Sequence, residues 1–372
     1  MVVRNLHLET RYFYNYTLTK AEQRLYRFML DLVLNRQYKF YYVIIPELLP
    51  DDKNPDVPRF FAVIEGEDEG ELDLYKTTDA VHWDFPEIFY ANAMELELDA
   101  DYLVHIGGKS MPTYTDKEID EINSKLYEIS HKFDLISDEF ELELAVHDYI
   151  TREFDYDDIL DERDGKDYQE GFNVVGLIKR GVGVCGALSF LMQFILQQHG
   201  IMVANIIKTL PDDELEYHSW LVVRIDGKFY HLDITFDETK TKTLDEPQYT
   251  SFNLTDAEIF ETHGALGEAY PGIVCNSTDA NYYVKKGLLF ESLDLLVEAT
   301  KKFLFTYKDT KKNMLYFYFR TPNITNSSVI IARFDEIIAY AKGLGMKIGE
   351  SGACVDDLGY GALNFSVRND LK

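Results

Sequence analysis

A cysteine inside a glycine-rich stretch is the first candidate for chemistry. Residues 181–186 read Gly-Val-Gly-Val-Cys-Gly, and an apolar-periodic segment follows that stops at Gly200. This pattern predicts a helix that begins at or near Cys185. The unpaired amides and the dipole of a helix N-terminus favour an anion, and therefore favour the thiolate form of this cysteine. The same amides can hydrogen-bond the oxyanion of a tetrahedral intermediate, as acyl transfer requires.

The glycine spacing also matches the G-x-G-x-x-G fingerprint of dinucleotide-binding loops. That fingerprint needs a buried strand before it and an acidic residue roughly 20 positions after it. Here Lys179-Arg180 precede the glycines, which is typical of a helix end or loop, and the residues near 206 read "VANIIKTL", without Asp or Glu. The glycines are therefore interpreted as clearance around the thiol of Cys185.

A histidine and an aspartate lie on a predicted hairpin further along the chain. Asp226-Gly227 separates two alternating runs, which is a strong hairpin signal. With these two residues as the loop, His218 lies opposite Thr235 and one diagonal step from Asp233. The Cβ atoms of the histidine and the aspartate are then roughly 7 Å apart or less. Both share the polar face of the hairpin with Trp220, while the other face is apolar.

Together these residues have the types that thiol chemistry needs. Cys185, His218 and Asp233 are predicted to act as the nucleophile, the base and the acid that orients the base. A metal site made of Cys185, His218 and His231 is the alternative, but it lacks a close ligand pair such as Cys-x-x-Cys. The sequence therefore predicts no metal ligands and no cofactor.

The same residues, in the same order, resemble the transglutaminase-like superfamily in its bacterial form. The resemblance rests on a "GVC" helix start, an "HSW" strand and the strand "DGKFYHLDITFD", and it spans about residues 140–290. It implies an α+β fold with a papain-like core, in which the nucleophile helix packs on an antiparallel sheet. By this resemblance Cys185 is the nucleophile, His218 the base and Asp233 its partner.

The elements around this core predict two flanking domains. We expect an N-terminal α+β domain over residues 1–135, the transglutaminase-like core over 136–290 and a small α/β unit over 291–372. Helices are predicted after the capping box Thr19-Lys-Ala-Glu22 and at 115–133, 139–154, 292–304 and 328–344. Strands are predicted at 39–45, 59–65, 94–99, 315–320 and 362–367.

Composition restricts the partners of the chain. It has 372 residues, with 65 acidic against 37 basic side chains and a formal net charge of −28. Such a surface repels phosphate backbones and anionic headgroups, so we expect neither nucleic acid nor membrane insertion. The acidic runs at 65–73 and 154–167 lack the spacing of an EF-hand and are interpreted as solvated loops. No secretion signal and an odd number of cysteines favour the cytoplasm.

The predicted function is thiol-dependent acyl transfer on peptide or protein amides through a Cys185 thioester. The enzyme is expected to be a peptidase or amidase, or else a transglutaminase; the sequence specifies neither this choice nor an oligomeric state. The alternative is a catalytically silent binding or scaffolding protein. That alternative draws on Phe236 and Leu221, which stand where the family more often has Trp and Asn.

Overall fold

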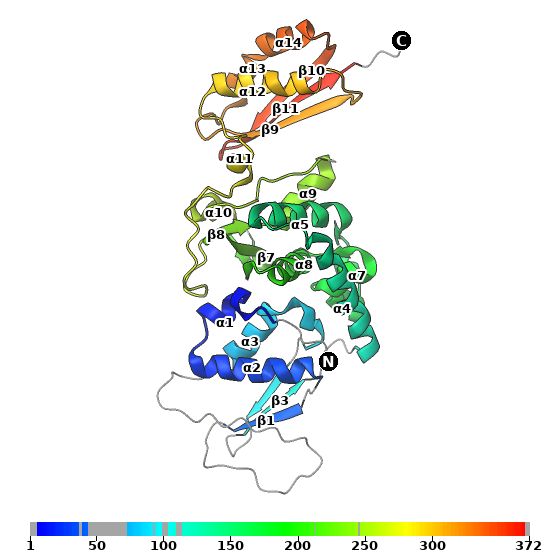
Figure 1. Ribbon diagram of the computed structural model, residues 1–372, viewed down its shortest axis with the longest axis vertical. Helices are drawn as coiled ribbons and strands as arrows, with labels where there is room; N and C mark the ends of the chain where they lie inside the picture. Colours follow the sequence, from blue (N-terminus) through cyan, green and yellow to red (C-terminus); the bar gives the residue numbers. More distant parts are fainter. Residues whose placement is uncertain are drawn as a thin grey trace. The chain divides into compact units, whose positions relative to one another are not determined.

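The computed structural model describes residues 6–36, 39–43, 73–91, 94–98, 103–108, 114–211, 213–244 and 246–368. The chain forms two compact units, Met1–Ser277 and Thr278–Lys372 (Figure 1). Helices and antiparallel sheets occur in both units, so the predicted α+β class is confirmed. The division into three domains with boundaries after residues 135 and 290 stays a prediction. Among the described residues, every helix is too short or too polar to cross a bilayer.

The first unit opens with short helices that pack together. The predicted capping box is present at the start of α2, where Thr19 accepts the amide of Glu22 and the Glu22 side chain accepts the amide of Thr19. A three-stranded antiparallel sheet of order β1-β3-β2 follows, and the predicted strand at 59–65 lies outside the described residues. The elements are η1 (Leu8–Thr10), α1 (Tyr12–Tyr16), α2 (Lys20–Leu34), β1 (Lys39–Val43), α3 (Leu74–Asp84), η2 (Pro86–Ala91), β2 (Met94–Leu98) and β3 (Leu103–Gly108).

Helices and two very short strands then lead to the cysteine. The segment after α5 pairs with the glycine stretch. Strands β4 and β5 run parallel, with Asp155 paired to Val182 and Tyr156 paired to Gly183. The elements are α4 (Asp116–Ser130), η3 (His131–Phe133), α5 (Glu139–Glu153), β4 (Asp155–Tyr156), η4 (Leu160–Glu162), α6 (Gly165–Glu170), α7 (Val174–Arg180), β5 (Val182–Gly183) and α8 (Cys185–Gln198). The predicted helices at 115–133 and 139–154 are confirmed.

A three-stranded antiparallel sheet of order β6-β7-β8 packs against α8 (Figure 1). Its strands are β6 (Met202–Leu210), β7 (Asp213–Ile225) and β8 (Lys228–Leu232). The predicted hairpin register is confirmed, since Ile225 pairs with Lys228 and Leu221 with Leu232. The predicted pairing of His218 with Thr235 is wrong.

The reason is that β8 ends at Leu232 and α9 (Ile234–Leu244) begins two residues later. The carboxylate of Asp233 accepts the amides of Thr235 and Phe236, so it captures donors that a helix start leaves free. The chain therefore turns into a helix where the alternating pattern predicts more strand. Helix α10 (Asp256–His263) follows in the same unit.

The second unit is a sheet of order β10-β11-β9 with helices packed on it (Figure 1). Its core joins apolar side chains of α12, α14 and the strands, among them Leu304, Phe319 and Leu363. The predicted helix at 328–344 is two helices, which meet at Ala332 and Arg333. The elements are α11 (Tyr282–Lys285), α12 (Leu293–Thr306), β9 (Met314–Arg320), α13 (Ser327–Ile331), α14 (Phe334–Gly343), β10 (Ile348–Val355) and β11 (Tyr360–Val367).

Candidate active site

Cys185 is the first residue of α8, as the sequence predicts. Its thiol is free and half-buried, whereas the helix is buried from Ala187 to Gln197. Gly181 ends α7 with a φ of 77°, a conformation that glycine adopts without cost. A Cβ atom on Gly183 would lie 2.5 Å from the Cβ of Ala187. The glycines thus let the chain turn tightly and pack against the first turn of α8, so that the thiol is presented at the helix N-terminus.

His218 and Asp233 are brought together from β7 and from the junction of β8 and α9. The Nε2 atom of His218 lies 2.8 Å from Oδ2 of Asp233. Burial lowers the pKa of His218, but hydrogen bonds to the Asp233 carboxylate and the Cys185 thiol outweigh it and raise the pKa to about 10. The histidine therefore holds its proton at neutral pH and lies within hydrogen-bond reach of the Cys185 thiol. All three predicted site residues meet here.

Asp233 is fully buried and receives four hydrogen bonds. Its Oδ1 atom accepts the backbone amides of Thr235 at 3.0 Å and Phe236 at 3.1 Å. Its Oδ2 atom contacts the Nε2 atoms of His218 and His263, each at 2.8 Å. Burial raises the pKa of Asp233, but the bonds from the two histidines outweigh burial and hold this pKa well below its usual range. An ionised carboxylate accepts only, so both imidazoles donate to it.

His263 was not predicted as a site residue. It is the last residue of α10, its side chain is 2% exposed, and its ring lies 5.1 Å from that of Phe236. It lies 30 positions after Asp233 on another element. A lone histidine at the end of a short helix carries no sequence signal that points to this carboxylate, so only the tertiary structure reveals the contact.

Trp220 and His231 occupy the polar face of the hairpin but are not among the residues that line the cleft. The indole of Trp220 stacks on His218 with ring centroids 6.2 Å apart, and its Nε1 donates to Nδ1 of His231 at 3.2 Å. Because the indole can only donate, Nε2 of His231 carries the proton, and it lies 2.9 Å from Asp256. Both nitrogens of His231 are thus engaged.

The alternative metal site of Cys185, His218 and His231 is not assembled. Within the part of the chain that the structure describes, two groups have ligand atoms close together: His218 with Asp233 and His263, and His231 with Asp256 and Cys275. In the first group the nitrogens lie 2.8 Å from the shared oxygen. That is a hydrogen-bond distance, shorter than the about 3.3 Å between neighbouring ligands of a tetrahedral zinc ion.

A cleft of about 890 Å³ opens above the thiol. His82 and Trp83 of α3 lie on its wall, so an N-terminal helix frames the cleft, while Cys185 stays half-buried. Burial lowers the pKa of His82 to about 4, which leaves that ring neutral. Further lining residues are Tyr156, Asp157, Asp158, Leu160, Asp161, Tyr168, Gln169, Phe172, Asn173, Val184, Gly186, Phe190, Ile207, Tyr217, His218 and Ser219.

The acidic run at 154–167 is thus more than a solvated loop. Asp158 and Asp161 are exposed, as predicted, but with Asp157 they also line the cleft. Asp157 is buried and forms a two-point ion pair with Arg163, at 2.7 and 3.1 Å. The pairing of β4 with β5 brings this run beside the glycine stretch, and a local reading of charge could not reveal that.

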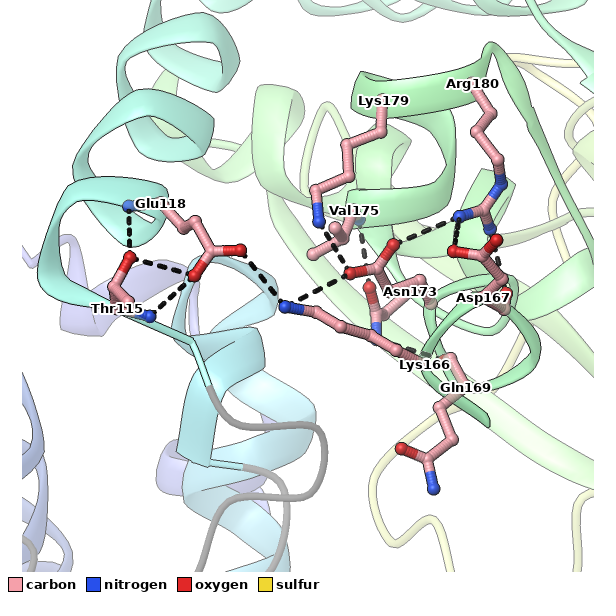
Figure 2. A network of polar contacts seen from close by, with 10 residues as sticks. Thr115, Glu118, Lys166, Asp167, Gln169, Asn173, Val175, Lys179 and Arg180 are labelled. Carbon is pink, nitrogen blue, oxygen red and sulfur yellow. Dashed lines mark hydrogen bonds and ion pairs between the residues drawn. The ribbon is translucent and has the colours of Figure 1, made fainter. Parts of the chain in front are cut away.

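A polar network supports the wall that carries Gln169 and Asn173 (Figure 2). Its centre is the buried Glu170, which lies 2.7 Å from Nζ of Lys179 and 3.0 Å from Nη1 of Arg180. Lys166 bridges to Glu118 at the capped start of α4, as Figure 2 shows. Helices α4, α6 and α7 are therefore tied together beside the cleft.

Comparison with known proteins places this core in a family. Residues 129–234 match the model of the transglutaminase-like superfamily. This segment, which contains Cys185, His218 and Asp233, is a transglutaminase-like domain. No curated protein matches the chain.

Two solved structures are similar at low identity. One is a candidate cysteine protease from Cytophaga hutchinsonii, 17% identical with a TM-score of 0.25 over 33% of this chain and 43% of that one. The other is a TGase, 14% identical with a TM-score of 0.29 over 67% of this chain and 69% of that one. The chain thus spans less than half the length of the first protein.

Proposed function

We propose that the protein is a thiol-dependent acyl-transfer enzyme that acts on peptide or protein amides through a thioester at Cys185. The observation that carries this proposal is the position of His218, which contacts Asp233 at 2.8 Å and also interacts with the Cys185 thiol, beside an open cleft. This is the arrangement of nucleophile, base and orienting acid that acyl transfer uses.

The first half of the reaction makes the thioester. The Cys185 thiolate attacks the carbonyl carbon of the amide, and the negative charge moves to the carbonyl oxygen. Amides in the first turn of α8 are suited to bind this oxyanion. The His218 imidazolium then gives its proton to the departing amine as the carbon–nitrogen bond breaks, which leaves an acyl-thioester and a neutral histidine.

The second half releases the acyl group. A water molecule or a primary amine attacks the thioester carbon while His218 takes its proton, and the sulfur leaves as a thiolate. Water gives a carboxylic acid, whereas an amine gives a new amide. We propose hydrolysis as the main outcome. Peptide substrates incubated with and without a primary amine separate the two by product mass.

Alkylation by iodoacetamide tests the catalytic assignment. The buried Cys275 and the exposed Cys354 serve as internal comparisons for Cys185, since all three thiols are free. We expect Cys185 to react faster than both, because a neighbouring imidazolium favours its thiolate. We expect His218→Ala to slow this reaction about 10-fold or more and to leave Cys354 unchanged. Intact mass with peptide mapping measures each rate.

The catalytically silent binding protein is the outcome if this test fails. It holds if Cys185 reacts no faster than Cys354 and the His218→Ala change leaves the rate as it was. Phe236 is the feature that favours it, since its ring packs 5.3 Å from that of His218 where the family more often has Trp. Because the mechanism requires reduced Cys185 and the other two thiols are also free, we propose the cytoplasm as the compartment.

A further inference from the structure

We propose that His263 is a positioning residue for the base: it holds Asp233 from the buried side and shares with His218 the charge of that carboxylate. This inference rests on the proposed function, since it concerns the same site. Its basis is the contact of both Nε2 atoms with a single oxygen, Oδ2 of Asp233, at 2.8 Å each.

Two sets of donors fix the carboxylate of Asp233. Backbone amides of the α9 start hold Oδ1, and the two imidazoles hold Oδ2. Rotation of the carboxylate would break bonds on both oxygens. Without His263, His218 would be the one side-chain donor on Oδ2 among the described residues, and it lies on the cleft side, where substrate and solvent reach it.

The surroundings of His263 keep its Nε2 a donor. Its Nδ1 lies 2.7 Å from the hydroxyl of Thr262, and that hydroxyl also lies 3.1 Å from the carbonyl of Ile259. The hydroxyl has one proton for two acceptors. If it donates to Nδ1, His263 is neutral with its proton on Nε2. If it donates to Ile259, Nδ1 also carries a proton and His263 is an imidazolium. Nε2 donates to Asp233 in both arrangements.

Helix α10, which carries His263, is held in place by contacts at its N-terminal end. Asp256, its first residue, lies 2.9 Å from Nε2 of His231 on β8 and accepts the amide of Cys275 at 3.0 Å. A capping box of Thr255 and Glu258 closes the same end. This bracing gives His231 a structural role. The helix lies beyond residues 129–234. His263 therefore belongs to a part of the chain that follows the segment matched by the family model.

Among the described residues, titratable groups face the two histidines from α8, β8 and the start of α9. Asp233 faces both, from the start of α9; Cys185 faces His218 from α8, and His231 interacts with His263 from β8. Two donors on one oxygen divide its negative charge. Removal of His263 should therefore leave more of the negative charge of Asp233 to interact with His218. It should also leave the Asp233 carboxylate less firmly positioned. The first effect raises the pH at which His218 loses its proton, and the second slows reactions at Cys185.

The test compares three variants in the full-length chain. His263→Leu removes the donor, His263→Gln keeps an amide donor near the Nε2 position, and His263→Asn has an amide too short to reach it. We measure alkylation of Cys185 by iodoacetamide and the titration of His218 by NMR with labelled histidine. Thermal unfolding reports that each variant is folded. His199→Leu, at the end of α8 where the ring bonds the Ser130 carbonyl at 3.0 Å, is the control.

We expect His263→Leu and His263→Asn to slow alkylation about 5-fold and to raise the His218 titration by about half a pH unit or more. His263→Gln and the control should stay within about twofold of wild type. The inference is overturned if the Leu or Asn variant folds and keeps both values, or if Gln loses as much as they do. Should His263→Leu fail to fold, the Asn and Gln pair decides.

Failure of the proposed function gives a different pattern. If His218→Ala does not slow alkylation of Cys185, the catalytic proposal is wrong whatever His263 does. If His218→Ala slows it and the His263 variants change neither alkylation nor the His218 titration, only the positioning role is wrong.

Discussion

At the scale of single residues, the site depends on how a buried carboxylate stays charged. Burial of an unpaired carboxylate is costly, and such a group usually takes up a proton instead. Asp233 avoids this because two backbone amides and two imidazoles donate to it. The resulting anion keeps His218 protonated beside the thiol of Cys185. One buried carboxylate thus raises the pKa of the candidate base.

The pKa of His218 makes a prediction about stability. In the folded protein this pKa is raised to about 10, against about 6.5 for a free histidine. The stabilisation is fully present below about pH 6.5 and is lost as the pH rises through 10. We therefore expect the free energy of unfolding of wild type, minus that of His218→Ala, to shrink by about 4 kcal/mol between pH 6.5 and 10. Urea unfolding at a series of pH values measures it.

Taking the difference between wild type and His218→Ala removes the contribution of a second buried histidine. His147 has a pKa raised to about 9 by Asp148 and Asp237 despite its burial, so it too makes the wild type less stable at high pH. Because His147 is present in both proteins, its contribution cancels in the difference. A difference that is constant from pH 6.5 to 10 would contradict the raised pKa of His218.

At the scale of elements, the cleft is made by short segments that hold each other in place. Helix α7 ends at Gly181, β5 pairs with β4, and α8 begins at once with the cysteine. None of these contacts is extensive by itself. The buried Glu170 at the end of α6 pairs with Lys179 and Arg180 of α7, and Lys166 of α6 pairs with Glu118 of α4 (Figure 2). We infer that this network keeps the wall of the cleft in position.

Glu170→Gln tests that role. The change leaves Lys179 and Arg180 without their shared buried anion, and loss of one partner of a buried pair is destabilising. Both cations are partly exposed, so we discount the effect to about 2 kcal/mol in the free energy of unfolding. Urea unfolding measures it, with Glu128→Gln on the exposed face of α4 as the control. A loss equal to that of the control would show that the network is dispensable.

At the scale of the whole molecule, charge is the dominant property. The chain carries a net charge of −28. Asp157, Asp158 and Asp161 line the same cleft as Cys185, and no Lys or Arg is among the described residues that line it. Asp157 is paired with Arg163, and protonated His218 adds a positive charge beside the thiol, but the exposed Asp158 and Asp161 make the cleft wall that carries them negative. Substrates with positive charge near the amide should therefore be favoured.

Matched peptides that differ only in Lys or Glu beside the reactive amide test this expectation. We expect the Lys peptide to have a kcat/KM about 10-fold higher at low salt, and the preference to fall as ionic strength rises. The double change Asp158→Asn with Asp161→Asn should reduce the preference. Glu162→Gln, on the same segment but outside the cleft lining, should not. Equal rates for the two peptides at low salt would rule out charge selection.

The candidate site could be predicted from the sequence where the signals are local. The apolar spacing and Gly200 define α8, and Asp226-Gly227 defines the hairpin register, so Cys185, His218 and Asp233 could be named in advance. Helix periods and turn residues act over a few positions and need no tertiary information. The pairing of His218 with Thr235 was wrong because the Asp233 side chain captures helix amides, which a period-2 pattern does not encode.

Only the tertiary structure decided what surrounds these three residues. Trp83 of α3 and the acidic segment at 154–167 meet at the cleft, and α10 brings His263 onto Asp233. These contacts join positions from 30 to about 100 residues apart, and which of them form depends on how the helices pack and not on local spacing. By itself, the sequence determined which side chains could do the chemistry. Packing decided which groups hold the carboxylate and which walls a substrate meets.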